Sequence, residues 1–220
     1  EASRAHAKAL VKIKVLKPAE FTKLNQGLNE IMKLFKQGKF KIRLEDEDCH
    51  TAIENYLIKK YGPLGKKIHT GRSRNDQVLV ATRLYSRKKL KQISAEMVKL
   101  EKVFLDMAKK YEYMPLPGYT HTRRAMPSSI GHWAAAYLED LINDHKLLVS
   151  AYELNDQNPL GAAAGFGVNF NLDRKLTTKL MGFQKTQINS LYAVNSRGKT
   201  ESYILAVCTQ IMMILGRLAN

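Results

Sequence analysis

The chain has 220 residues, enough for one large or two modest domains with a real hydrophobic core. Its apolar fraction of 45% and charged fraction of 25% are typical of a globular protein, which excludes disorder over most of the length. Lysine and arginine outnumber aspartate and glutamate by 36 to 20, and this net charge of +16 is expected to attract anions such as nucleic acid, acidic membranes, polycarboxylates or phosphates.

The cysteines and the apolar stretches indicate where the protein works. Cys49 and Cys208 lie far apart, which fits a reducing compartment and argues against a disulfide framework or a zinc site. The N-terminal stretch has no long apolar core, so it is not a secretory signal. The apolar stretch at 203–215 is broken by Thr209 and Gln210 and is too short to span a bilayer. We therefore expect a soluble cytoplasmic protein. Because both ends fall in helical patterns, we also expect this chain to be part of something longer.

Apolar periodicity predicts helices in the first third of the chain. Pro18 suits the first turn of a helix, and apolar residues then recur at steps of three and four. A short helix is predicted over 48–60, with Asp48 as its cap or first-turn acid and Gly62 beyond its end. The apolar face after Pro18 consists of Phe21, Leu24, Leu28, Ile31 and Phe35.

A long helix is predicted from about Asn75, where Asp76 can cap it, because no glycine or proline follows until Pro115. Its apolar residues alternate steps of four and three, which gives the narrow seam of a bundle helix. The seam consists of Ile93, Met97, Leu100, Phe104, Met107 and Tyr111.

The remaining segments alternate between loops and helices. Residues 114–127 are predicted as a loop, with Pro127 opening a helix that runs to about Tyr152. Residues 158–170 form a Gly/Ala-rich loop, and a last long helix covers about 199–218. No strand is expected. The pattern predicts an all-α, elongated helix bundle with its chemistry in the loops.

The stretch "KKIHTGRSRND" at 66–76 carries many hydrogen-bond donors and little to bury. Gly71 lets the backbone approach a ligand, and Arg72 and Arg74 can grip a carboxylate or phosphate in a two-pronged way. The amides of a following helix would add partial positive charge, so an anion site is one interpretation. The alternative is a solvated basic loop in which Asp76 caps the helix. Neutral donors are available from Thr70, Ser73 and Asn75.

The histidines differ in what they indicate. His121, in the loop "GYTHTRRAMP", is a side chain suited to proton transfer near neutral pH, although an exposed residue at a helix entry is the alternative. Acids at 45–48 precede His50, but nothing repeats at ligand spacing, so no metal site is expected. His132 and His145 fall within a predicted long helix and are predicted to be structural, and His6 carries no signal.

Three segments gain meaning from occurring together in one order: "HTGRSRNDQ" at 69–77, "GYTHTRRAMP" at 118–127 and "NPLGAAAG" at 158–165. Together they resemble argininosuccinate lyase, within the fumarase/aspartase superfamily. The segment "DEDCHTAIE" at 46–54 is similar to the one the family places before the first motif. The resemblance covers nearly the whole chain. Its first motif is highly specific, since adenylosuccinate lyase and fumarase read differently there, whereas the second is shared more loosely.

The resemblance implies a cofactor-free elimination in arginine biosynthesis that splits argininosuccinate into arginine and fumarate. His121 matches the histidine that the family assigns to proton transfer, and no metal is implied. The implied substrate-binding residues are Asn75, Thr120, Arg74, Ser73 and Arg72, and the implied supporting residues are Asp48, His50 and His69.

The resemblance also implies an organisation: a fumarase/aspartase-like long helix bundle, incomplete here, with a smaller helical N-terminal domain. Residues 1–74 would be that N-terminal domain without its start, and 75–220 would be the central bundle without its C-terminal part. The family's third motif, a serine-rich loop, would lie beyond residue 220. The family assembles each site from three subunits of a homotetramer, so this chain alone is expected to be inactive. Its expected partners are small molecules and further copies, with neither nucleic acid nor membrane.

Five positions depart from the commoner family pattern, which has glutamine at two of them and acids at the other three. We interpret the chain as a variant lyase. Two alternatives remain: a non-catalytic structural protein like the related lens crystallins, and a basic helical nucleic-acid binder. Basic residues spread over many helices without interleaved aromatic residues argue against the latter. The departures are Arg123, Met126, Tyr192, Asn195 and Gly198.

Overall fold

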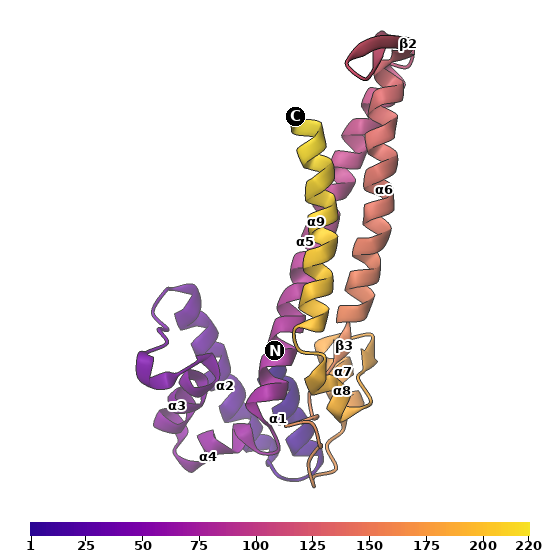
Figure 1. Cartoon of the computed structure of the whole chain (residues 1–220). Coiled ribbons are helices and arrows are strands. Elements are labelled where there is room, and N and C mark those ends of the chain that lie inside the picture. The colour runs from indigo at the N-terminus through magenta and orange to yellow at the C-terminus, as the bar shows by residue number, and fades with distance from the viewer. The chain divides into compact units, whose positions relative to one another are not determined.

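The computed structural model describes residues 1–220, most of them in helices (Figure 1). The chain divides into two compact units. The first unit comprises residues 1–84 and 156–197, and the second comprises residues 85–155 and 198–220. These units are groups of residues in mutual contact, and the predicted domain boundary at residues 74/75 stays a prediction.

The first unit consists of short and medium helices. Pro18 begins α2 and Asp48 caps α3, accepting hydrogen bonds from the amides of His50 and Thr51, as the sequence predicts. Gly62 ends α3 with a φ of 60°. Two two-residue strands pair in parallel. The elements are α1 (Ala2–Lys12), α2 (Pro18–Lys36), η1 (Leu44–Asp46), α3 (Cys49–Tyr61), α4 (Pro63–Lys66), η2 (Lys67–His69), the start of α5 (Arg74–Lys110), β3 (Gln157–Asn158), α7 (Arg174–Met181), β4 (Lys185–Thr186) and α8 (Ser190–Asn195).

Two apolar clusters hold the first unit together. In the larger one, Leu24 and Ile31 of α2 are buried against α1, α3 and Ile68. Phe35 was expected on the same face, but it is 65% exposed because it lies in the last turn of α2, outside the cluster. The smaller cluster joins α1 to the start of α5 and to α7, and consists of Ala5, Val80, Leu160, Met181 and Phe183.

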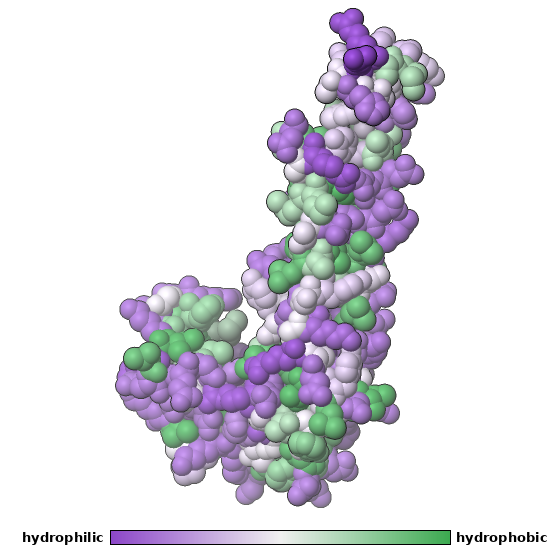
Figure 2. Space-filling view, in the orientation of Figure 1, coloured by the Kyte–Doolittle hydropathy of each residue, from purple (hydrophilic) through white to green (hydrophobic).

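The second unit is a bundle made from α5, α6 (Ile130–Asn155) and α9 (Lys199–Ala219). The seam predicted for α5 is confirmed from Ile93 to Met107, since Met97 and Phe104 are buried and the seam residues between and beside them pack against the same core; Tyr111 is outside this cluster. Hydrophobic side chains also gather on the visible surface partway along these helices (Figure 2). On α9 the exposed ones are Leu205, Met212 and Met213.

Helix α9 exceeds the apolar stretch read from the sequence. The helix has 21 residues, because it includes residues on both sides of that stretch. By length and composition alone it could therefore cross a membrane, contrary to our expectation. The core helix of a soluble protein passes the same test. Val207, Ile211 and Ile214 of α9 are buried in the core of the bundle, which accounts for part of its apolar character.

The segment expected as a loop at 114–127 is instead a β-hairpin of β1 (Pro115–Thr120) and β2 (Arg123–Ser129). His121 and Thr122 form its turn, with φ values of 50° and 66°, the left-handed conformation that tight two-residue hairpin turns require. The sequence has no Asn-Gly signal here, and prolines argue against strands, which explains why the hairpin was missed.

The geometry of the hairpin accounts for its prolines, for Gly118 and for where α6 begins. A two-stranded hairpin has only edge strands, where a proline need not donate to the ladder. A Cβ atom on Gly118 would lie 2.6 Å from the carbonyl oxygen of Met126, so glycine is required where the register shifts. Because β2 extends to Ser129, α6 begins at Ile130 and not at Pro127.

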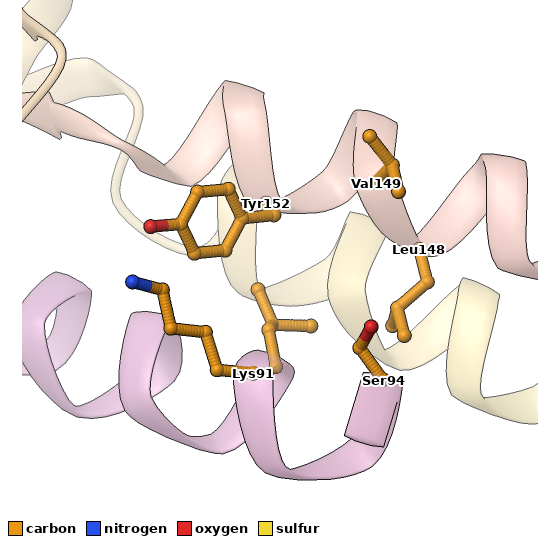
Figure 3. Close-up of a pocket in the computed structure, with 6 residues that line it drawn as sticks. Lys91, Ser94, Leu148, Val149 and Tyr152 are labelled. Atoms are coloured by element: carbon orange, nitrogen blue, oxygen red, sulfur yellow. The ribbon is translucent and has the colours of Figure 1, made fainter. Parts of the chain in front are cut away.

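A chain of polar side chains links α5 to α6. Nε2 of His145 lies 2.8 Å from Oγ of Ser94, and its Nδ1 lies 2.7 Å from a carboxylate oxygen of Glu101. Beside Ser94 is an open pocket of about 280 Å³, also lined by Lys91, Tyr152 and apolar residues (Figure 3). The amides around Ser94 lie inside a continuous helix, so they cannot stabilise an oxyanion. This Ser-His-Glu chain is therefore a structural link between helices, as predicted for His145.

Candidate active site

The start of α5 is organised around Asp76, whose side chain is fully buried. One carboxylate oxygen accepts a hydrogen bond from the amide of Ser73 at 3.1 Å, as an acid in the first turn of a helix often does. The other accepts bonds from the amides of Gly161 and Ala163, at 3.0 and 3.1 Å. The motif loop 69–77 is thereby fastened to the motif loop 158–165, although the two are more than 80 residues apart in sequence.

Arg174 holds the second of these loops from its other side. Its Nε donates to the carbonyl of Leu160 at 3.0 Å, and its two terminal nitrogens donate to the carbonyls of Gln187 and Ile188. Burial lowers the pKa of Arg174, and the charge of Asp76 opposes that shift. The loop is thus fixed by a buried carboxylate and a half-buried guanidinium, which leaves it little freedom.

Arg74 was predicted to bind substrate, but in the structure its guanidinium already contacts protein groups. It donates to a carboxylate oxygen of Asp48 and, at 2.6 Å, to Oγ1 of Thr51. Burial alone would raise the pKa of Asp48, but hydrogen bonds from Arg74 and from the amides of Thr51 and His50 outweigh it and lower the pKa to about 2. Asp48 therefore stays ionised and joins the cap of α3 to the start of α5.

Arg72 and His6 lie beneath the loop. Arg72 donates to Oγ of Ser3 at 3.1 Å, while its Nε has no hydrogen-bond partner, and burial lowers its pKa to about 10. Nε2 of His6 lies 2.8 Å from the carbonyl oxygen of Thr70. Burial, together with the charge of Arg72, lowers the pKa of His6 to about 3, so His6 is a neutral hydrogen-bond donor at physiological pH. Both side chains support the loop from inside.

The remaining predicted residues of this region lie around the same helix start. His69 is 3.2 Å from the side-chain amide of Gln77 and 3.7 Å from the carboxylate of Glu54. Burial lowers the pKa of the half-buried His50. Asn75 is half-buried, and its side chain makes no hydrogen bond, whereas its amide donates to Oγ of Ser73. Asn75 is thus the predicted binding residue whose side chain is free to meet a ligand.

Thr120 and His121 belong to the second unit, so they are not part of the cluster built in the first. Both are exposed, and the ring of His121 makes no hydrogen bond. The hydroxyl of Thr122 donates to the carbonyl oxygen of His121 at 2.6 Å, within the turn. The departures Arg123 and Met126 are exposed on the same hairpin. The structure therefore presents His121 at a surface tip, without a partner in its own unit.

Sequence reasoning missed the residues that hold the site together. Asp76 was predicted only as a helix cap, and Arg174 was not singled out at all. Apart from the Asp76–Ser73 cap, their bonds join residues 13 to 87 positions apart, and no local pattern indicates such pairs. A usable signal was available for Asp76: it stands three and four residues before the apolar Leu79 and Val80, so it shares a helix face with them, and a carboxylate on a buried face needs hydrogen-bond partners.

Comparisons with known proteins show the family and the fold of the chain. A family model described as a lyase matches residues 1–220, and the chain belongs to this lyase family. The chain is 46% identical over 220 residues to an argininosuccinate lyase of Thermotoga neapolitana, which covers 100% of this chain and 55% of the relative. It is 44% identical over 218 residues to one of Xanthomonas oryzae pv. oryzae, covering 99% and 51%. The predicted relationship to argininosuccinate lyases is confirmed, and the chain spans about half the length of these relatives.

Solved structures show the same fold. EDDS lyase in complex with formate superposes with a TM-score of 0.89 at 25% identity, covering 99% of this chain and 42% of that one. A variant of EDDS lyase with bound fumarate superposes with a TM-score of 0.90 at 26% sequence identity, with the same coverage of both chains. A Brucella melitensis fumarate lyase:delta crystallin superposes with a TM-score of 0.84 at 18% sequence identity, covering 100% of this chain and 53% of that one. At this identity the likeness shows the fold alone. The predicted all-α, fumarase-like fold is confirmed.

Proposed function

We propose that this chain is the N-terminal and partial central portion of an argininosuccinate lyase, which splits argininosuccinate into arginine and fumarate without a cofactor. The observation that carries the proposal is the buried Asp76. It fastens two motif loops together and leaves the side chain of Asn75 free at the first turn of α5. The identity of 46% to a curated argininosuccinate lyase supports the substrate. The non-catalytic and nucleic-acid-binding alternatives are not favoured, because the relatives are lyases.

The chemistry requires donors around a carboxylate that gains charge. A base removes the proton next to a substrate carboxylate, the C–N bond breaks as a C=C bond forms, and an acid protonates the departing guanidino nitrogen. In this proposal the side chains of Asn75 and Ser73 face the substrate carboxylates at the start of α5, where helix-end partial charges stabilise anions. His121 moves a proton, which suits an unbonded imidazole. Arg74 acts through Asp48 and orients the loop.

A site that uses both Asn75 and His121 requires more than one copy of the chain in this proposal. Asn75 lies in the first turn of α5, and the hairpin with His121 follows its last turn. Asn75 belongs to the first compact unit and His121 to the second. We propose that copies assemble as a homotetramer and that the hairpin of one copy completes the site of another. The exposed apolar residues of α9 support such packing.

The proposal includes a cytoplasmic location. The two cysteines are both free, one of them exposed, as in proteins from a reducing compartment.

Fumarate release from argininosuccinate, followed by ultraviolet absorbance, tests the proposed function. The complete product of the gene and the 220-residue chain are assayed side by side, with an Asn75→Ala variant of the complete product as the control. We expect fumarate from the complete product alone. A folded, assembled product that releases none would refute the lyase proposal and leave the structural role.

A further inference from the structure

The first unit contains an open pocket of about 760 Å³, none of whose lining residues was assigned to the candidate active site. It lies between the end of α2, the segment that follows it, and α3. Its volume is within the range of small-molecule sites. The lining residues are mostly basic and polar, with aromatic rings among them. Those that the argument uses are Lys39, Phe40, Lys41, Arg43, Tyr56 and Lys59.

The charges that line the pocket do not cancel. Its two acids are already paired: Glu45 forms an ion pair with Arg43 at 3.0 Å, and Asp46 accepts hydrogen bonds from the amide of Arg43 and the side chain of Asn55, both at 3.0 Å. Of the lining lysines, Lys60 is paired with Glu30.

Three lining lysines are left over. Lys39, Lys41 and Lys59 are exposed and form no ion pair, so the pocket presents three unneutralised ammonium groups. Ammonium groups act as point charges suited to phosphate, whereas the guanidinium fork that matches a carboxylate is already used by Arg43.

Aromatic rings form another part of the pocket wall. Phe40 and Tyr56 pack edge to face, with ring centroids 6.3 Å apart and planes at 69°. Both are partly exposed and line the pocket together with Leu34 and Ala52. A flat apolar group can rest against such rings while charged groups of the same ligand meet the lysines.

The pocket lies close in sequence to the ion pair that anchors the candidate active site. Asp46 lines the pocket, and its carbonyl oxygen accepts a hydrogen bond from the amide of Asp48 at 2.6 Å. Glu47, between them, has a φ of 59°, a left-handed conformation that is costly for this residue. Asp48 in turn binds Arg74. A ligand that moves residues 43–46 would therefore act directly on the Asp48–Arg74 pair.

We propose that this pocket is a binding site for a nucleoside polyphosphate, with the phosphates on Lys39, Lys41 and Lys59 and the base against Phe40 and Tyr56. Binding does not depend on the proposed lyase function. An effect of the bound nucleotide on turnover, through Asp48 and Arg74, rests on it.

Calorimetric titration of the complete protein with ATP and with inorganic tripolyphosphate tests the site. A Lys41→Glu/Lys59→Glu variant is compared with a Lys23→Glu/Lys175→Glu variant, which has the same change of charge on two exposed lysines of the same unit outside the pocket. We expect ATP to bind wild type and control alike, about tenfold more weakly to the pocket variant, and more tightly than tripolyphosphate. Circular dichroism verifies that the variants fold.

Three results would overturn the proposal. They are no binding of ATP to the wild type, equal weakening in the pocket and control variants, or tripolyphosphate binding as tightly as ATP, which would remove the role of the rings. An active enzyme that binds no ATP defeats the pocket alone, whereas an inactive protein that binds ATP defeats the lyase proposal alone.

Discussion

The first motif loop and the β-hairpin carry the two halves of the proposed chemistry, and they are built in opposite ways. The loop at 69–77 is fastened from within by the buried side chains of Asp76, Arg72 and His6. The hairpin presents His121 at an exposed turn without a partner in its own unit. A binding surface must be preorganised, so its contacts lie inside one chain. In the proposed assembly, His121 acts on a ligand held by another copy, which explains why it is left at a surface.

The backbone shows the same contrast. Ala163 has a φ of 51° in the loop that Asp76 holds through its amide. His121 and Thr122 have similarly positive values at the hairpin turn. Each left-handed residue costs roughly 1 kcal/mol or more. Buried hydrogen bonds offset that cost in the first case, and the pairing of β1 with β2 offsets it in the second.

The largest expected effect concerns the exposed β-hairpin that carries His121. His121→Asn in the complete protein should lower turnover by about 10²- to 10⁴-fold, because proton transfer is lost, while substrate affinity changes little. Asparagine tolerates the left-handed conformation at this position, so folding is preserved. Fumarate release at saturating substrate measures the effect. His132→Asn, the same change at an exposed position on α6, is the control, and unchanged turnover in His121→Asn would remove this residue from the mechanism.

Asp76→Asn tests the buried contacts that hold the motif loop at 69–77. Both carboxylate oxygens of Asp76 accept hydrogen bonds from backbone N–H groups. In the asparagine variant, an NH₂ group replaces one of these oxygens and its N–H faces a backbone N–H, so at least one hydrogen bond is lost. The free energy of unfolding should therefore fall by about 2–3 kcal/mol. Urea denaturation measures it. Asp173→Asn, at the partly exposed cap of α7, keeps an oxygen that can cap the helix and loses an ion pair with an exposed lysine, Lys12, so it should cost only about 1 kcal/mol or less. Equal losses at the two positions would show that Asp76 is no more than a helix cap.

His6, buried beneath the motif loop at 69–77, makes the stability of the folded chain depend on pH. Its pKa is about 3 in the folded chain and 6.5 when free, so the unfolded state binds more protons between these values, and stability falls as pH decreases. From pH 6.5 to 5 the loss should be about 1–2 kcal/mol. His6→Gln keeps a donor for the Thr70 carbonyl and cannot titrate, so its stability curve should be flatter by that amount. Parallel curves for the two proteins would contradict the burial of a neutral histidine.

The smallest effect concerns Arg74 and Asp48. Their side chains are 41% and 36% exposed, so solvent screens the pair, and a double-mutant cycle with Arg74→Gln and Asp48→Asn should give a coupling of about 0.5–1 kcal/mol. Substrate binding should weaken in Arg74→Ala because the loop loses its anchor. If Asp48→Asn weakens binding as much as Arg74→Ala does, the anchor interpretation holds. Weaker binding in Arg74→Ala alone would show direct contact with substrate.

Local rules predicted the helices well. Pro18, the Asp48 cap and the seam of α5 follow from interactions within a few residues, and all three are confirmed. The loop motifs indicated an anion site at the start of α5, but the long-range bonds of Asp76 and Arg174 leave no trace in local spacing. The hairpin was missed because its strands contain prolines and its turn uses His121 and Thr122 instead of glycine.

The most direct test of the account mixes two variants of the complete protein, Asn75→Ala and His121→Asn. Each should be nearly inactive alone, since every site lacks one of its two halves. After the two variants are unfolded and refolded together, some sites should combine an intact Asn75 from one copy with an intact His121 from another, and fumarate release should rise well above the sum of the separate variants. A mixture no more active than its components, with assembly verified, would contradict a site shared between copies.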